Sequence, residues 1–252
     1  MKHIFLTLIA WLVVMGIEAA HPIEFNIVFI GNSITQGVQI ENPDKQAPPP
    51  QATRLLNERG FIVKSVNCGV SGATTYNFLP GQGHLFSPVI QAADHFYATG
   101  KPLVFSVMLG TNDSAVAGTT GAPVSPDQYY KNMEVIIDSL LSRYSNSTII
   151  IHRPIWYSPN THNGSIYLSE GLARLKTYTP KLKALEAAHP GRVFVGDKKA
   201  YSYFKKNHLK YLIPENGNSG VFYLHPNAEG AEKLGDFWAK AIAKRMNEEL
   251  KK

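Results

Sequence analysis

A short apolar run that ends in a glycine-flanked serine constrains the fold of this chain most strongly. Residues 27–30 are β-branched or aromatic throughout and do not alternate with polar residues, which predicts a strand buried on both faces. Gly31 lets the backbone turn sharply at the carboxyl end of this strand, and Ser33 follows directly. In open α/β sheets ligands bind at this edge, where a following helix directs free N–H groups at them. From this segment alone two roles are open for Ser33, a helix cap or a catalytic nucleophile.

Further apolar runs alternate with amphipathic segments along the rest of the chain. We predict additional strands over residues 61–66, 103–109, 148–151 and 193–195. Helices are predicted over residues 51–59, 88–97, 126–143, 169–188 and 228–249, with Pro180 as a point where the fourth can break. Residues 39–50 are expected to form a loop, and residues 196–222 an irregular stretch. Because strands and helices alternate and hairpin signals are few, we predict a parallel, doubly wound sheet with helices on both faces.

Polar residues follow three of these strands, and a histidine precedes the last helix. Ser33 lies in Gly-Asn-Ser, Gly72 in a Ser-Gly segment, and Asn112 in Gly-Thr-Asn-Asp, and His225 is followed by proline. The carboxyl ends of parallel strands share one edge, so these residues can converge there. Acyl transfer needs a nucleophile, a base and donors for the developing oxyanion. We assign Ser33 as nucleophile and His225 as base, with the N–H groups of Ser33 and Gly72 and the Asn112 side-chain amide as oxyanion donors.

These four segments, in this order, resemble the sequence blocks of the SGNH hydrolase superfamily, also called GDSL esterases and lipases. They extend over residues 27–235, nearly the whole chain after its first segment. The resemblance implies a three-layer α/β/α, flavodoxin-like fold, with Ser33, Gly72, Asn112 and His225 in the roles assigned above. No cofactor or metal is expected, because the other histidines lack metal-ligand spacing and are predicted to be surface or loop residues. They are His84, His95, His152, His162, His189 and His208.

The chain departs from the family pattern at two positions. Asn32 stands where the family has aspartate, and it can make many of the same hydrogen bonds. Phe222 stands three residues before His225, where the family has the acid of its triad, and a phenyl ring cannot orient an imidazole. Either a backbone carbonyl holds His225 in a Ser–His dyad, or a carboxylate such as Glu215 reaches it from elsewhere. We favour the dyad and predict a main-chain oxygen at the His225 nitrogen that faces away from Ser33.

The first twenty residues have the pattern of a signal peptide. Lys2 and His3 precede an apolar stretch over residues 4–17, and Ala19 and Ala20 provide the small residues of a cleavage site. The apolar stretch is short for a membrane span, so stable membrane insertion is not expected, although a retained anchor is an alternative. We therefore predict a secreted or periplasmic protein, with residues 1–20 as signal peptide and residues 21–252 as a single domain.

Composition excludes some classes of partner. The net charge is +6, but the lysines are scattered and accompany no nucleic-acid-binding motif, so no nucleic-acid partner is expected. Cys68 is the only cysteine, which rules out an internal disulfide, and its place at the end of an apolar run favours a buried small residue. The sequence does not determine the oligomeric state.

These features predict a secreted serine esterase that removes a small acyl group, acetyl, from a carbohydrate, as similar exported family members often do. Sialates and plant polysaccharides both remain open as substrates. Alternatives are a non-catalytic carbohydrate-binding protein on a decayed esterase fold and a general short-chain lipase or esterase. Sugar-contacting side chains, if not packing residues, are expected among Arg153, Trp156, Tyr157, Tyr76 and Asn77.

Overall fold

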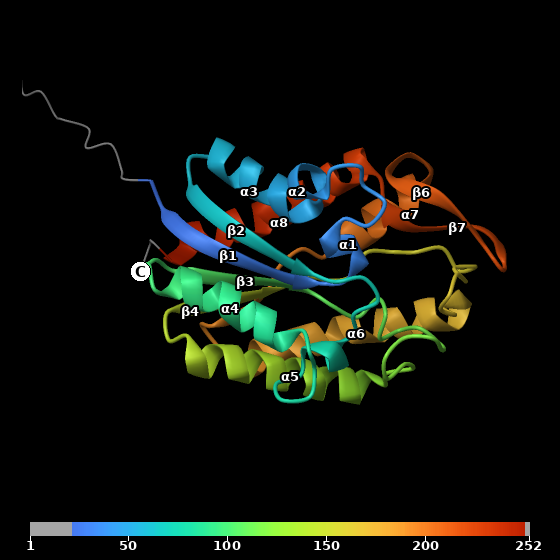
Figure 1. Ribbon diagram of the computed structural model, residues 1–252, viewed down its shortest axis with the longest axis horizontal. Helices are drawn as coiled ribbons and strands as arrows, with labels where there is room; N and C mark the ends of the chain where they lie inside the picture. Colours follow the sequence, from blue (N-terminus) through green and yellow to red (C-terminus); the bar gives the residue numbers. More distant parts are fainter. Residues whose placement is uncertain (1–21, 250–252) are drawn as a thin grey trace, which may run out of the picture.

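Five parallel strands form the central sheet of the computed structural model, which describes residues 22–249 (Figure 1). The strands are β1 (Glu24–Gly31), β2 (Ile62–Gly69), β3 (Leu103–Met108), β4 (Ser147–Ile151) and β5 (Val193–Val195). Their spatial order is β2-β1-β3-β4-β5. The chain runs outward from β1 to β2 and then crosses back to β3, so the order reverses at β1. A reversal of this kind opens a crevice at the carboxyl ends of the strands, which is where Ser33 lies.

Helices cover both faces of the sheet, as predicted (Figure 1). On one face lie α3 (Pro48–Glu58) and α8 (Ala228–Glu249), which pack against each other. On the other lie α4 (Phe86–Tyr97), α5 (Pro126–Arg143) and α6 (Leu168–Ala188). The strands β3 and β4 between these layers are buried along their whole length, which explains their continuous apolar sequence. This three-layer arrangement confirms the predicted fold class.

Most predicted elements are present, but two segments differ from the prediction. In residues 39–50, α2 (Pro43–Gln46) forms and α3 begins at Pro48, because proline at a first helical position needs no N–H partner. Residues 196–222 were expected to be irregular. They contain α7 (Ala200–Tyr211) and an antiparallel hairpin of β6 (Leu212–Gly217) and β7 (Gly220–Pro226). Helix α6 is continuous through Pro180.

One histidine that was predicted to be a surface or loop residue, His152, lies in the core. His152 is 1% exposed and stacks on Trp238 of α8, which also stacks on Phe29 of β1. Its Nδ1 accepts a hydrogen bond from the backbone N–H of Asp197 at 3.0 Å, so its Nε2 donates to Ser106 Oγ at 3.0 Å. Burial lowers the pKa of His152 to about 3. His152 is therefore a neutral core residue.

The thiol of Cys68 was predicted to be a small packing group rather than a reactive one. Cys68 is half-buried at the end of β2, and burial raises the pKa of its thiol to about 11, as expected of an unreactive packing residue. The predicted signal peptide, residues 1–20, lies outside the described residues. Within residues 22–249, the helices are too short or too polar to span a bilayer.

Candidate active site

Ser33 is the first residue of the short helix α1 (Ser33–Gln36), at the carboxyl end of β1. The cap of this helix is Asn32, whose Oδ1 accepts the backbone N–H of Ile34 at 3.0 Å. The capping role considered for Ser33 therefore belongs to its neighbour, which leaves the serine hydroxyl free for another partner. Gly31 is required at the preceding turn, because a Cβ there would lie 2.0 Å from Thr35 Oγ1.

His225 connects Ser33 to a carboxylate. Its Nε2 lies 2.9 Å from Ser33 Oγ, and its Nδ1 lies 2.9 Å from Glu215 Oε1. A carboxylate can only accept, so Nδ1 carries the proton and Nε2 is free to accept one from the serine hydroxyl. The predicted Ser–His dyad is therefore wrong, because a carboxylate oxygen occupies the place where we expected a main-chain oxygen. Ser33, His225 and Glu215 form a chain of hydrogen bonds with the geometry of a catalytic triad.

The hairpin explains how Glu215 reaches His225. Glu215 on β6 is the register partner of Phe222 on β7, the position three residues before His225. The acid therefore comes from the strand opposite the position where the family has it. Phe222 is 1% exposed and packs in the core, a role that suits a phenyl ring.

Gln39 holds the second oxygen of the same carboxylate. Its Nε2 donates to Glu215 Oε2 at 2.6 Å, while the Gln39 backbone has a φ of 67°, a conformation uncommon outside glycine. Burial raises the pKa of Glu215, but the hydrogen bonds from His225 and Gln39 favour the charged form and outweigh burial, so this pKa lies below its ordinary value. Glu215 is therefore ionised at neutral pH.

Gly72 lies at the tip of a tight turn beside β2. The N–H of Ala73 donates to the carbonyl of Val70 at 3.2 Å, and Gly72 has a φ of 75° at the third position, where turns of this kind favour glycine. The turn is fixed by Gln36, whose Oε1 accepts the N–H of Ser71 at 2.7 Å. Apart from Gly72 and its two chain neighbours, no described residue has an atom within 4 Å of the place a Gly72 Cβ would occupy, so this side of the turn is open for a substrate to approach.

Asn112 is oriented by two hydrogen bonds. One proton of its Nδ2 is donated to the carbonyl of Ala73 at 2.8 Å, and its Oδ1 accepts from the hydroxyl of Tyr167 at 2.6 Å. Burial raises the pKa of Tyr167 to about 12, which keeps the hydroxyl protonated as a donor. The second Nδ2 proton has no partner among the described residues. The sequence analysis did not identify Tyr167, because it lies 55 residues after Asn112 in the chain, directly before α6.

Asp113, next to Asn112, ties the loop after β3 to Thr75 by hydrogen bonds. It is fully buried and accepts both the backbone N–H of Thr75, at 3.0 Å, and its hydroxyl, at 2.5 Å. Asn132 of α5 donates to the Thr75 hydroxyl at 2.8 Å and extends the network. Burial raises the pKa of Asp113 to about 6, and the hydrogen bonds from Thr75 oppose this only in part.

The proposed sugar-contacting residues are mostly packing residues. Trp156 and Tyr157 are buried, and the guanidinium of Arg153 lies 3.8 Å from the centre of the Tyr201 ring. Tyr76 packs beside Gly121, where a Cβ would lie 2.3 Å from its ring. Asn77 is the exception, because it lines a groove that begins at Gly72.

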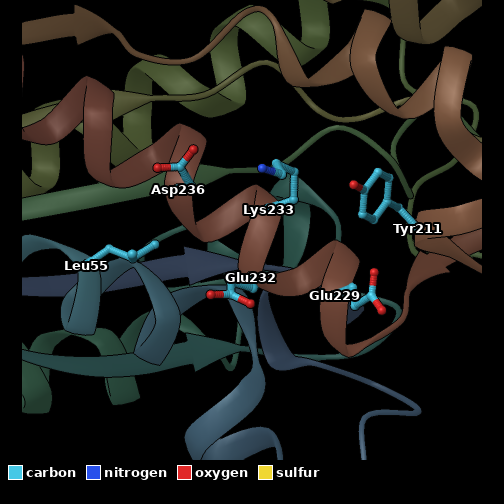
Figure 2. A pocket seen from close by; sticks show the side chains of 6 residues that line it. All are labelled: Leu55, Tyr211, Glu229, Glu232, Lys233 and Asp236. Atoms are coloured by element: carbon cyan, nitrogen blue, oxygen red, sulfur yellow. The ribbon is translucent and has the colours of Figure 1, made fainter.

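A separate hollow of about 480 Å³ lies beside α8 (Figure 2). It is lined by Leu55, Tyr211, Glu229, Glu232, Lys233 and Asp236. The carboxylates of Glu232 and Asp236 already pair with arginines of α3 and its C-terminus, at 2.7 Å and 2.8 Å. None of the four residues predicted from the sequence lines this hollow.

Comparison with known proteins identifies the family of this chain. Residues 29–233 match the model of the GDSL-like lipase/acylhydrolase family. Similar solved structures include a carbohydrate acetylesterase from Sinorhizobium meliloti, with 20% identity over 87% of this chain and 98% of that chain and a TM-score of 0.58. An aryl esterase from M. smegmatis has 19% identity over 87% and 98% of the two chains and a TM-score of 0.59.

A lipase/acylhydrolase from Enterococcus faecalis is also similar, with 20% identity over 87% of this chain and 96% of that chain and a TM-score of 0.59. Among curated proteins there is no significant match. At these identities the likeness to solved structures concerns the fold, while the family match extends over most of the sequence. This chain therefore belongs to the GDSL-like lipase/acylhydrolase family, whose members are ester hydrolases of the SGNH type.

Proposed function

We propose that this protein is a secreted serine esterase that removes an acetyl group from a carbohydrate. The observation that carries the proposal is the chain of contacts from Ser33 Oγ through both nitrogens of His225 to Glu215. The carbohydrate class is supported by the groove at Gly72, whose lining contains hydroxyl and amide side chains but no aspartate, glutamate, lysine or arginine, and by the similar fold of a carbohydrate acetylesterase. Export is supported by the signal-peptide pattern of residues 1–20.

In the first step, His225 Nε2 takes the proton of Ser33 as Oγ attacks the ester carbonyl carbon. Glu215 stabilises the imidazolium that forms and fixes the tautomer of the ring. The carbonyl oxygen becomes an oxyanion, for which three donors are available: the N–H of Ser33, the N–H of Gly72 and the second Nδ2 proton of Asn112. Neither N–H donates to another group among the described residues. Donors held in place before the reaction stabilise the transition state without further reorganisation.

In the second step, the oxyanion collapses and the sugar alcohol leaves with the proton from His225. Acetyl-Ser33 remains. His225 then removes a proton from water, which attacks the acetyl carbon, and the serine leaves with the proton on its oxygen. Acetate and the free enzyme result, and no cofactor enters the balance.

Acetate release tests this proposal. Purified protein is incubated with a panel of acetylated xylan fragments, acetylated pectin fragments and O-acetylated sialic acid, and with p-nitrophenyl acetate as a substrate that needs no sugar site. We expect acetate from at least one glycan and from p-nitrophenyl acetate, and none above background from Ser33→Ala. Hydrolysis of p-nitrophenyl acetate without release from any glycan would contradict the carbohydrate assignment and leave a general short-chain esterase.

The non-catalytic alternative makes the opposite prediction. A decayed esterase fold would bind glycans and release no acetate from any ester. The carboxylate at His225 argues against this alternative, because Phe222, its one supporting feature in the sequence, has a replacement across the hairpin.

A further inference from the structure

A groove of about 310 Å³ begins at Gly72, beside the proposed oxyanion donors. Besides Gly72, its polar lining includes Asn77, His84, Thr119, Thr120 and Ser165, and we call it the polar groove. Thr119 also donates its hydroxyl proton to the main-chain carbonyl of Asn112 at 2.7 Å. A substrate whose carbonyl lies against Gly72 and Asn112 therefore has part of its body at the mouth of this groove.

The polar groove carries no permanently charged side chain that could pair with an anion, and His84 is its one titratable side chain. None of its lining residues is aspartate, glutamate, lysine or arginine. The backbone N–H groups of Thr74 and Thr75, at the start of the short 3₁₀ helix η1 (Thr75–Phe78), are already taken by Asn77 Oδ1 and Asp113 Oδ1. A carboxylate on the substrate would therefore lose water in the polar groove without gaining a permanently charged partner such as lysine or arginine.

Two hydroxyls of the polar groove can only accept hydrogen bonds from a ligand. A serine or threonine hydroxyl has one proton. That of Thr119 is donated to the Asn112 carbonyl at 2.7 Å, and that of Ser165 to the Gly118 carbonyl at 3.1 Å. Both oxygens keep free lone pairs, which sugar hydroxyls can satisfy by donating. A carboxylate has no proton to donate and would leave them unpaired.

We propose that the polar groove binds the uncharged, hydroxyl-bearing part of the ester and selects acetylated neutral sugars over acetylated sugars that carry a carboxylate. Sialates and uronates are thereby disfavoured as substrates. This inference rests on the proposed function and narrows its substrate class. It assigns the selection to Thr119, Thr120 and Ser165, which lie on the loops after β3 and before α6.

A matched pair of substrates tests the inference. The 3-O-acetyl derivatives of methyl glucoside and methyl glucuronide differ only in a hydroxymethyl group against a carboxylate, which is ionised at pH 7. We expect kcat/KM of the wild-type protein to be at least tenfold higher for the glucoside. Thr120→Arg places a cation at the polar groove and is expected to lower this ratio about tenfold. Ser165→Ala removes one acceptor and is expected to lower kcat/KM for the glucoside, measured relative to p-nitrophenyl acetate.

Matched controls separate the polar groove from general surface effects. Gln82→Arg adds the same charge on a neighbouring exposed loop outside the polar groove, and Ser169→Ala removes an exposed hydroxyl beyond it. Both controls are expected to keep the wild-type ratio. Equal hydrolysis of the two substrates by wild type, or equal ratios in Thr120→Arg and Gln82→Arg, would overturn the inference while leaving the esterase function intact.

A binding measurement keeps the inference testable if no ester is hydrolysed. In that case the proposed function fails, and methyl glucoside and methyl glucuronide are titrated into the protein while the ring signals of His84 are followed by NMR. The inference expects His84 to respond to the glucoside at lower concentration than to the glucuronide. A stronger response to the glucuronide, or none to either sugar, would contradict it.

Discussion

Glu215 Oε1 lies 2.9 Å from His225 Nδ1 and 3.3 Å from the backbone N–H of the same histidine. The carboxylate thus contacts both the ring and the main chain of the residue it orients. A hairpin, rather than a three-residue spacing, provides this contact, because the two residues lie on opposite strands. Glu215 lies on β6 and His225 on β7, and the same histidine contacts Ser33 through its other ring nitrogen.

Glu215→Gln is expected to lower kcat severely, by up to ~10⁴, because a neutral amide stabilises the imidazolium less and its NH2 group can face Nδ1, which favours the wrong tautomer. KM for p-nitrophenyl acetate should change little, since Glu215 acts on the reaction rather than on binding. Glu41→Gln, at an exposed glutamate of the loop before α2, serves as the control and should retain wild-type activity. Retention of most activity in Glu215→Gln would restore the dyad that the structure contradicts.

Gln39 is expected to act through Glu215. Gln39→Ala removes the donor to Glu215 Oε2 and should lower kcat by about tenfold, the effect of one charge-assisted hydrogen bond. Gln39→Gly removes the same donor but suits the positive φ of this residue, so it should lower kcat equally and unfold at a higher urea concentration than Gln39→Ala. If kcat recovered in the glycine variant, backbone strain rather than the side chain would be the cause.

Tyr167 is expected to position Asn112, the proposed side-chain oxyanion donor. Tyr167→Phe should lower kcat by about tenfold without raising KM, because the amide can then rotate away from the oxyanion. Tyr157→Phe is the matched control, since it also deletes a buried hydroxyl, one that bonds Ser114 at 2.9 Å. In the Asn112→Ala background, Tyr167→Phe should have no further effect on kcat. Additive losses in the double variant would show that Tyr167 acts elsewhere.

Part of this site could be predicted from the sequence, because local patterns determine it. The strand-end glycines locate Ser33, Gly72 and Asn112, each within a few residues of the end of a strand. Glu215 and Tyr167 could not be located in this way. The partner of Glu215 depends on the register of a hairpin, and that of Tyr167 on how α6 packs beside the loop after β3. Such pairings are tertiary, and no short-range periodicity encodes them.

Dependence on tertiary contacts also explains why the hairpin of β6 and β7 and the burial of His152 were not predicted. The Asn-Ser turn between Gly217 and Gly220 is a hairpin signal, with Gly220 at a φ of 89°, but it lies between short strands of mixed polarity. His152 was grouped with the other histidines as a surface or loop residue, because none of them shows metal-ligand spacing. Its ring is buried by contacts with distant segments, among them Trp238 of the last helix and the backbone of Asp197.

Asp113 and His152 are expected to shape the pH dependence of stability in opposite directions. His152 has a pKa of about 3 in the folded state against 6.5 for a free histidine, so the unfolded state binds an extra proton below pH 6.5 and stability falls on acidification. Asp113 has a pKa of about 6 against 3.8, so the folded state binds the extra proton between these values. Over this window the two contributions offset each other.

Asp113→Asn should therefore expose the histidine contribution. Relative to wild type, the free energy of unfolding of this variant should fall by about 2 kcal/mol more between pH 6 and pH 4, because Asp113 is only partly titrated at the two ends of this range. Urea unfolding at pH 4, 5 and 6 measures this difference, with the exposed Asp44→Asn as control. Parallel stability curves for Asp113→Asn and wild type would contradict the account.

Covalent labelling of Ser33 tests the central claim most directly. Diethyl p-nitrophenyl phosphate phosphorylates an activated serine, and mass spectrometry locates the label after digestion. We predict one diethylphosphoryl group per chain, on the peptide that contains Ser33, formed in step with the loss of p-nitrophenyl acetate hydrolysis. Labelling should be absent in Ser33→Ala and far slower in His225→Ala. Stoichiometric labelling of another residue, or full esterase activity in folded Ser33→Ala protein, would contradict the account.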